Sequence, residues 1–176
     1  MTMGPLDGVR VIDQTTVVVG PICARTLGDY GADVIKVESP SGDLLRTMAQ
    51  GSRNVGMSGK FLNFNRNKRS VCLDIKKKEG LRALKKLIQT ADVFVSNVRP
   101  QGLMRAGLDY EALSADNPRL IYCSIVGFGK GVCFHTFSQT ACLPTIIAHL
   151  CFDVISMLEI LRKGWKNKVL QGRFIC

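Results

Sequence analysis

Two clusters of cationic side chains offer the first candidate chemistry in this sequence. Residues 65–69 read Asn-Arg-Asn-Lys-Arg and residues 76–78 are three lysines, with a β-like stretch between them. The planar fork of arginine and the compact ammonium of lysine both match the oxygens of a phosphate group. The pattern therefore predicts a phosphate site, although a solvated charged face would produce the same residues.

A second candidate is the sequence Ser-Asn-Val-Arg-Pro at residues 96–100, which directly follows a stretch typical of a buried strand. Ligands of open α/β sheets bind outside the carboxyl ends of the strands, so Asn97 and Arg99 are well placed to contact one. A simple turn made by Asn97 and Pro100 explains the same residues. Both interpretations stay open from the sequence.

Three other chemistries have little support. Gly20, Gly28 and Gly31 do not form the G-x-G-x-x-G pattern of dinucleotide sites, although Glu38 would suit a ribose. The sequence pI near 9.5 fits nucleic acid, but aromatic residues are not interleaved with the cations. We therefore expect no nicotinamide cofactor and no nucleic-acid partner.

Metal binding is the third chemistry with little support. The cysteines and histidines that suggest it match no usual zinc spacing, so we expect no metal site. These residues are Cys133, His135, Cys142, His149 and Cys151.

The elements that must position the candidates follow from hydrophobic patterning. Helical spacing of leucines predicts a helix over residues 77–89, and Gly20-Pro21 predicts a turn into a helix over 22–30. Short helices are expected between residues 103 and 113. Strand-like stretches cover residues 9–13, 15–20, 33–38, 70–75, 93–96 and 120–125. This alternation predicts an α/β fold with a parallel sheet.

Composition divides the chain near residue 130. The 176 residues carry a net charge of +10 and are 46% hydrophobic, which suits one globular core rather than a disordered chain. Residues 131–176 hold four of the seven cysteines, both histidines and the single tryptophan. We therefore distinguish residues 1–130 from a divergent tail at 131–176.

The compartment is suggested by two features. Cys23, Cys72 and Cys123 lie in apolar stretches, which is typical of reduced cysteine. The amino-terminal residues lack the pattern of a secretion or import signal. We expect a cytoplasmic protein, with mitochondria and peroxisomes left open. The mostly apolar residues 142–161 are interrupted by Pro144 and Asp153, so we expect no membrane partner.

A series of short motifs resembles the amino-terminal part of the family III CoA-transferases, which include formyl-CoA transferase, carnitine CoA-transferase and α-methylacyl-CoA racemase. The motifs are PLDGVRVID (5–13), GP (20–21), LGDYGADVIKVE (27–38), GD (42–43), NRNKRS (65–70), LDIK (73–76), ADV (91–93), NVRP (97–100), GL (107–108), NPRL (117–120) and GFG (127–129). This ordered series is far more specific than any single motif in it.

The resemblance implies part of a Rossmann-like large domain that binds coenzyme A, in subunits that form interlocked homodimers. CoA or acyl-CoA would be a substrate alongside a carboxylic acid, and no cofactor would be bound permanently. Carried over by motif, the CoA-binding residues would be Leu73, Lys76, Asn97, Val98, Arg99 and Arg105. Val18 would lie near the thioester, where formyl-CoA transferases have glutamine, and Ser39 replaces an arginine of some members.

The resemblance also implies a catalytic group that this sequence does not match. An aspartate attacks the acyl-CoA carbonyl in the transferases, and a His and Asp pair exchanges the α-proton in the racemases. Both sets follow the Gly-Phe-Gly motif, but here the expected Gly-Pro is missing and the aspartate position falls near Leu170. We therefore expect a truncated or inactive acyl-CoA transferase with a frameshifted or alternatively spliced tail.

Three alternatives to that expectation stay open. These are a racemase-like homologue, a non-catalytic CoA-binding or interaction fragment, and a basic nucleic-acid-binding module that only the net charge favours. In each truncated form, we expect an exposed sheet edge where the rest of the domain would pack. The sequence gives neither the acyl substrate nor the choice between transfer and racemisation.

Overall fold

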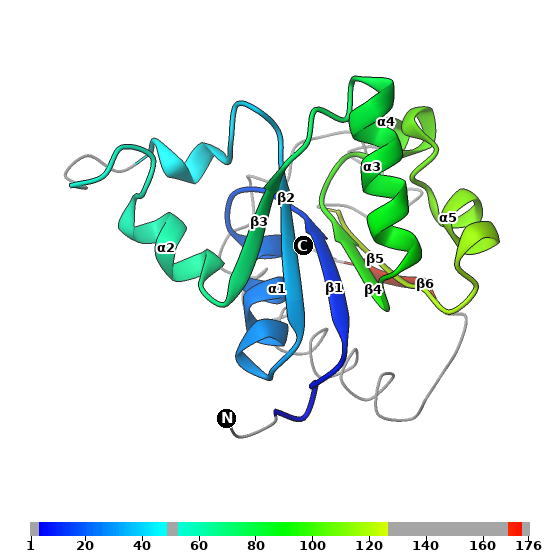
Figure 1. Ribbon diagram of the computed structural model, residues 1–176, viewed down its shortest axis with the longest axis horizontal. Coiled ribbons are helices and arrows are strands. Elements are labelled where there is room, and N and C mark those ends of the chain that lie inside the picture. The colour runs from blue at the N-terminus through cyan, green and yellow to red at the C-terminus, as the bar shows by residue number, and fades with distance from the viewer. Residues whose placement is uncertain (1–3, 49–52, 127–168, 174–176) are drawn as a thin grey trace.

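One parallel sheet organises the protein. The computed structural model describes residues 4–48, 53–126 and 169–173. The strands are β1 (Arg10–Gln14), β2 (Asp33–Glu38), β3 (Lys68–Cys72), β4 (Val93–Ser96), β5 (Ile121–Val126) and β6 (Val169–Arg173). They lie in the order β3-β2-β1-β4-β5-β6, and every neighbouring pair is parallel (Figure 1). The predicted α/β fold with a parallel sheet is confirmed.

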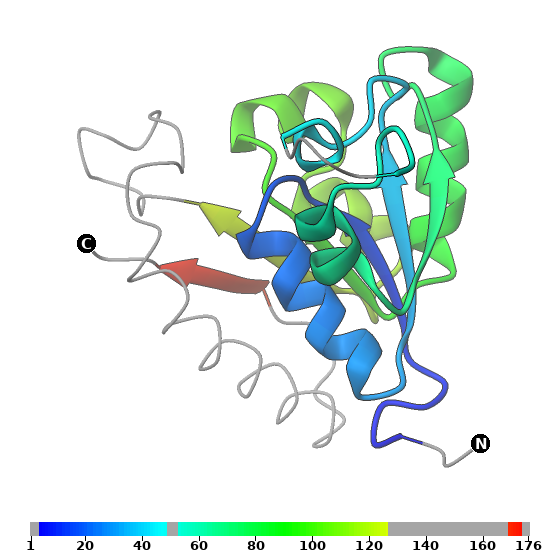
Figure 2. The same cartoon turned by 90° about the vertical axis from the view of Figure 1, so that its left-hand side faces the viewer.

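Helices connect the strands and cover both faces of the sheet. They are α1 (Val19–Asp29), the short 3-10 helix η1 (Leu44–Arg46), α2 (Gly59–Asn65), α3 (Lys78–Gln89), α4 (Pro100–Ala106) and α5 (Tyr110–Asp116). Figure 2 shows α1 and α3 on opposite sides of the sheet. This is the doubly wound arrangement, in which the strand order reverses between β1 and β4. Open α/β sheets bind their ligands outside the carboxyl ends of the strands at such a reversal, and we call this place the crevice.

Alternation along the strands creates two hydrophobic cores. Val11, Val34 and Val95 face α1 and pack with its buried Leu27. On the other face, Ile12, Val37 and Phe94 pack with residues of α3, α4 and α5. Because successive side chains of a strand point to opposite faces, each central strand contributes to both cores.

Helices α3 and α4 illustrate how local sequence sets the element bounds. In α3, Leu84 and Ile88 are one turn apart and fully buried, while Lys86 lies exposed. Helix α4 begins at Pro100, whose missing N–H is not needed in a first turn, and ends at Ala106, where the following Gly107 adopts the left-handed conformation. These signals stop α4 after seven residues.

The expected strand at residues 15–20 is wrong. Helix α1 already begins at Val19, and residues 15–18 form the connection from β1. The β-branched residues favoured a strand. However, a Cβ on Gly20 would lie 2.3 Å from the Thr15 Cβ, so the glycine lets the helix pack directly against this connection.

The expected strand at residues 70–75 is shifted, because β3 covers Lys68–Cys72 instead. Its register with β2 runs from Val34↔Lys68 to Glu38↔Cys72, so β3 ends where its partner ends. Helix α2, which packs beside α1, was not expected from the sequence.

Strand β5 is not the edge of the sheet, because β6 follows it and is itself the last strand. Strand β6 pairs with β5 in parallel, from Tyr122↔Val169 to Val126↔Arg173. Five residues of the 131–176 segment therefore extend the sheet, although their sequence shows no strong strand pattern. A backbone edge needs only a partner backbone to satisfy its hydrogen bonds.

Candidate functional site

The connections leaving β1 and β4 meet at the crevice where the strand order reverses. The Asn97 side-chain oxygen accepts a hydrogen bond from the Thr16 N–H at 3.1 Å, and its side-chain nitrogen donates to the Thr16 carbonyl at 2.9 Å. These bonds lie just beyond the last ladder pair, Gln14↔Ser96. Asn97 therefore joins the two sides of the crevice, and the simple turn interpretation of residues 96–100 does not describe it.

Hydrogen bonds to buried side chains also fix the connection after β1, at Thr15. Thr15 donates from its N–H and from its hydroxyl to the carboxylate of Asp13. The buried ammonium of Lys36 donates to the Thr15 carbonyl at 2.9 Å. The N–H, the hydroxyl and the carbonyl of Thr15 are therefore all hydrogen-bonded, which restricts the conformation of this segment.

Val17 adopts an unusual conformation in this connection, with a φ of 71°. A β-branched residue rarely occupies the left-handed region, which costs of order 1–3 kcal/mol. The Val17 N–H donates to both carboxylate oxygens of Asp43, at 3.2 and 3.3 Å. Asp43 also forms a buried ion pair with Lys36 at 3.1 Å, so a desolvated charge pair holds the strained turn.

Val18 follows this turn and precedes α1. Its side chain is half-buried, and its carbonyl accepts the first helical hydrogen bond from Ile22. The residue therefore lies at the carboxyl edge of the sheet, where the resemblance places the thioester. Sequence reasoning named Val18 but missed Thr16, Lys36 and Asp43, which fix its position. Only the Gly-Asp motif at residues 42–43 gave a sign of Asp43.

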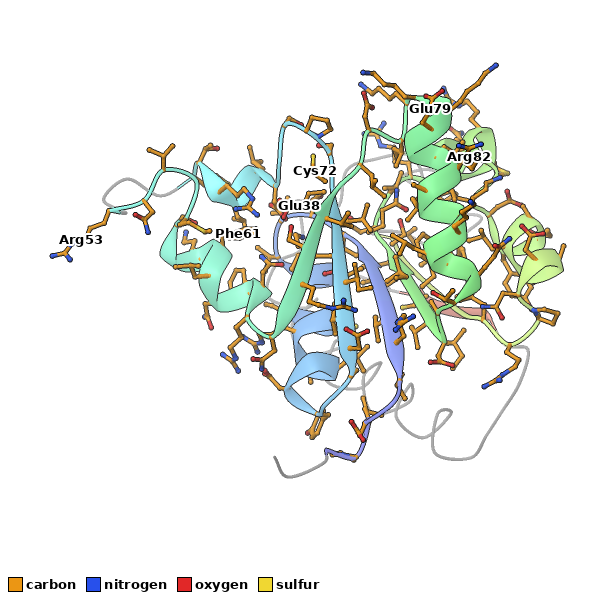
Figure 3. All side chains as sticks on the ribbon, viewed as in Figure 1. Glu38, Arg53, Phe61, Cys72, Glu79 and Arg82 are labelled. Atoms are coloured by element: carbon orange, nitrogen blue, oxygen red, sulfur yellow. The ribbon has the colours of Figure 1, made fainter. Side chains whose placement is uncertain are left out.

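Leu73 and Lys76 follow β3 at the same edge. The Leu73 side chain is half-buried against the core shared with α3, and the Leu73 N–H donates to the Glu38 carbonyl. Lys76 is exposed, and no hydrogen bond or ion pair joins its ammonium to another of the described residues. Figure 3 shows Cys72 and Glu38 at this edge and Glu79 in the first turn of α3.

Val98 and Arg99 lie in the connection between β4 and α4, and Arg105 lies in α4. Val98 is half-buried against the α3-side core, and Arg99 is exposed at the N-cap of α4. Arg105 lies six residues later in the last turn, about 9 Å along the helix axis from Arg99. It too is exposed, and its Nε donates to the Gln101 carbonyl at 3.3 Å. The structure therefore gathers the other six predicted site residues at the carboxyl edge and leaves Arg105 farther along α4.

The cations at residues 66–69 do not join this edge. Arg66 pairs with Asp29 at 2.7 Å, and Arg69 pairs with Asp33 at 2.6 Å. Both arginines lie near the amino end of β3, the opposite edge from Lys76. Part of the predicted phosphate cluster is thus wrong, because these cations already have carboxylate partners.

Lys68, the third cation of the cluster at residues 65–69, is also unavailable to a phosphate. Its ammonium is buried and contacts the Asp13 carboxylate at 2.8 Å and the Pro21 carbonyl at 2.9 Å. Burial lowers the pKa of Lys68 below its ordinary value, and the attraction of Asp13 only partly offsets this. Lys68 therefore anchors the start of α1 to β1 rather than facing a ligand.

Glu38 is likewise unavailable for the ribose that its position suggested. Arg46 donates two hydrogen bonds of 2.7 Å to the Glu38 carboxylate. The Ser70 hydroxyl and the Asp43 N–H also donate to this carboxylate. Burial acts to raise the pKa of Glu38, but the bonds from Arg46 and Ser70 outweigh it and lower the pKa. Arg46 also lies 3.8 Å over the Phe61 ring, so Glu38 ties η1 and α2 to the sheet.

Other predicted features can be placed only in part. Within residues 4–48 and 53–126, no group of three or more metal-ligating side chains gathers. The cysteines and histidines between 133 and 151 lie outside the described residues. No helix in the described part is long and apolar enough to cross a membrane. Ser39, at the position of the missing arginine, is exposed and contacts the Ser41 hydroxyl at 2.8 Å.

The fold is an open α/β domain whose strand order reverses between β1 and β4. The model of CoA-transferase family III matches residues 6–140, and the chain belongs to this family. It is 44% identical over 132 residues to a succinate–glutarate CoA-transferase of Agrobacterium fabrum, covering 72% of this chain and 33% of that one. It is 49% identical over 127 residues to a formyl-CoA:oxalate CoA-transferase of Rhodopseudomonas palustris, covering 72% and 30%.

Solved structures agree with this assignment. A CAIB/BAIF family protein from Brucella suis superposes with a TM-score of 0.79 at 31% identity, covering 97% of this chain and 52% of that one. A Mycobacterium tuberculosis protein gives a TM-score of 0.83 at 27% identity, covering 97% and 55%. The chain spans about a third of the length of the curated relatives named above and about half of these solved chains.

Proposed function

We propose that residues 1–130 are the amino-terminal part of a coenzyme A-binding domain and that the carboxyl edge of β1, β3 and β4 holds the nucleotide of CoA or acyl-CoA. The observation that carries this is the Asn97–Thr16 contact, which joins the motif at residues 97–100 to the connection after β1. In a complete enzyme of this family the crevice would serve CoA transfer between carboxylic acids.

Charge supports the proposal. CoA carries a diphosphate and a 3′-phosphate, and oxyanions of this kind are matched by arginine and lysine. Arg66, Lys68 and Arg69 are neutralised by carboxylates, whereas Lys76 and Arg99 are exposed and have no ion-pair partner among the described residues. Lys76 and Arg99, which have no carboxylate partner among the residues that the structure describes, therefore lie at the edge with Asn97.

Apolar side chains support an adenine subsite beside these cations. Leu73 and Val98 are both half-buried and pack against the same core, just after β3 and β4 respectively. A flat ring placed against them would remove further apolar surface from water. We assign Leu73 and Val98 to the base, Asn97 beside it, and Lys76, Arg99 and Arg105 to the phosphates, with Val18 toward the thioester.

The proposal for this chain is binding without transfer. The position that the resemblance gives to the nucleophilic aspartate falls near Leu170, whose side chain has no group able to attack a carbonyl. The residues 131–176 have the composition of a divergent tail, so we assign no catalytic step to them. The 176-residue chain is expected to bind CoA and to leave acyl-CoA unconverted.

Calorimetric titration of the chain with CoA tests the proposal. Lys76→Ala should weaken CoA binding about tenfold, because it removes a charged contact to phosphate. Lys86→Ala is the matched control, since Lys86 is an exposed lysine in the last turn of α3, away from the edge. Equal effects of both variants, or no CoA binding by the unmodified chain, would overturn the proposed function.

A further inference from the structure

Gln14 is a buried polar residue that the site described above does not use. It is the last residue of β1 and is only 7% exposed. Its side-chain oxygen Oε1 is buried and has no hydrogen-bond partner, a property shared by only one other side-chain atom in the described part of the chain, Arg25 Nε. Arg25 lies 3.6 Å from the Asp29 carboxylate, so its charge is matched. Gln14 has no such compensation.

The strand pattern places Gln14 at the candidate adenine subsite. Ile12 faces the α3-side core, and Gln14, two residues later, lies on the same face. Its register partner on β4 is Ser96, two residues before Val98. On the other side, β2 separates it from β3 and Leu73. Gln14 therefore lies between the two strands whose ends carry the apolar residues Leu73 and Val98.

A buried oxygen without a hydrogen-bond partner lowers the stability of the folded protein, and nothing else in the described part of the fold requires it. Leaving a buried acceptor unsatisfied costs the desolvation of that group, so nearly all such atoms in proteins are bonded. An apolar residue would fill the end of β1 without this cost. A ligand that donates a hydrogen bond to Gln14 explains why a carboxamide stands here.

We propose that Gln14 recognises the adenine base of coenzyme A through the amino group of the base, an inference that rests on the proposed function. A glutamine carboxamide presents an acceptor beside two donor hydrogens. Adenine presents its amino donor beside a ring-nitrogen acceptor, which is the pattern that glutamine pairs with in nucleic acids. Gln14 is thus the residue that selects adenine from other bases at this site.

The test compares two ligands and two proteins by calorimetric titration. The ligands are CoA and a CoA analogue whose base is purine, with hydrogen in place of the amino group. The unmodified chain should bind CoA about tenfold more tightly than the analogue, because only CoA satisfies the buried oxygen. The Gln14→Met variant keeps a similar side-chain volume and should bind both ligands within about twofold of each other.

Thermal unfolding separates recognition from a structural role. If Gln14 serves the ligand, Gln14→Met should leave the midpoint of the unliganded protein unchanged or raise it, since the variant removes an unsatisfied buried group. A lowered midpoint, or an unmodified chain that binds CoA and the analogue equally, would overturn the inference while leaving CoA binding intact. Failure of the unmodified chain to bind CoA would overturn the proposed function itself.

Discussion

Asn97 and Thr16 form a two-point contact across the crevice, in which one carboxamide bonds both polar atoms of one backbone residue. The two distances are 3.1 Å to the Thr16 nitrogen and 2.9 Å to its carbonyl oxygen. The residues are 81 positions apart, and the contact continues the β1–β4 pairing past its last ladder pair. Asn97 therefore sets the separation of the two connections between which we place CoA.

Replacing Asn97 by aspartate should disrupt this contact, because a carboxylate accepts from the Thr16 N–H but repels the Thr16 carbonyl. We expect the free energy of unfolding to fall by about 1–2 kcal/mol and CoA binding to weaken at least severalfold. Urea unfolding and calorimetry measure the two effects.

Asn117→Asp is the matched control for that change. Asn117 also donates from its carboxamide to backbone carbonyls, those of Ile88 and Ala91, but it lies near the end of α3, away from the crevice. This variant should lose stability and keep CoA affinity. Weaker CoA binding in both variants would contradict a specific role of Asn97.

Val17→Gly should stabilise the protein, because glycine adopts a φ of 71° without the steric clash that the valine Cβ causes. We expect the free energy of unfolding to rise by about 1 kcal/mol. Val18→Gly is the control, since Val18 has a φ of −121° and glycine there only adds freedom to the unfolded chain. A loss of stability for Val17→Gly as large as that for Val18→Gly would show that the turn is unstrained.

Lys68→Met should destabilise the protein by about 3–5 kcal/mol, because it leaves the buried Asp13 carboxylate without its cation. Arg66→Met removes an exposed partner of Asp29 and should cost less than about 1 kcal/mol. Urea unfolding of both variants gives the comparison. Similar losses would mean that the Lys68 pair behaves as a surface pair.

Acid should weaken the protein through Glu38. Its pKa is lowered in the folded state from an ordinary value of 4.5, so in acid the unfolded state binds the proton first. The stabilisation is complete above about pH 4.5 and is lost as the pH falls through the folded-state pKa. Glu38→Gln should flatten this part of the stability profile. An unchanged slope between pH 5 and 3 in that variant would assign the acid sensitivity to other carboxyls, such as Asp29 and Asp33.

The sequence by itself determined the strands and helices whose apolar spacing is regular. The run that became β4 is a nearly continuous apolar stretch, the run that became β2 is rich in β-branched residues, and α3 repeats its leucines at helical spacing. The ordered series of motifs indicated the family, because the series is far more specific than any single motif in it. Asn97 was found in this way, since it directly follows a buried strand.

Only the tertiary structure decided which charged residues stay available. Lys68 and Lys76 look equivalent in the sequence, but Asp13, 55 residues before Lys68, neutralises the first, whereas the second is exposed. The conformation of Val17 and the unpartnered oxygen of Gln14 depend in the same way on residues of other strands. The physical reason is that ion pairing, strain and burial are set by distances in space, which local sequence patterns do not encode.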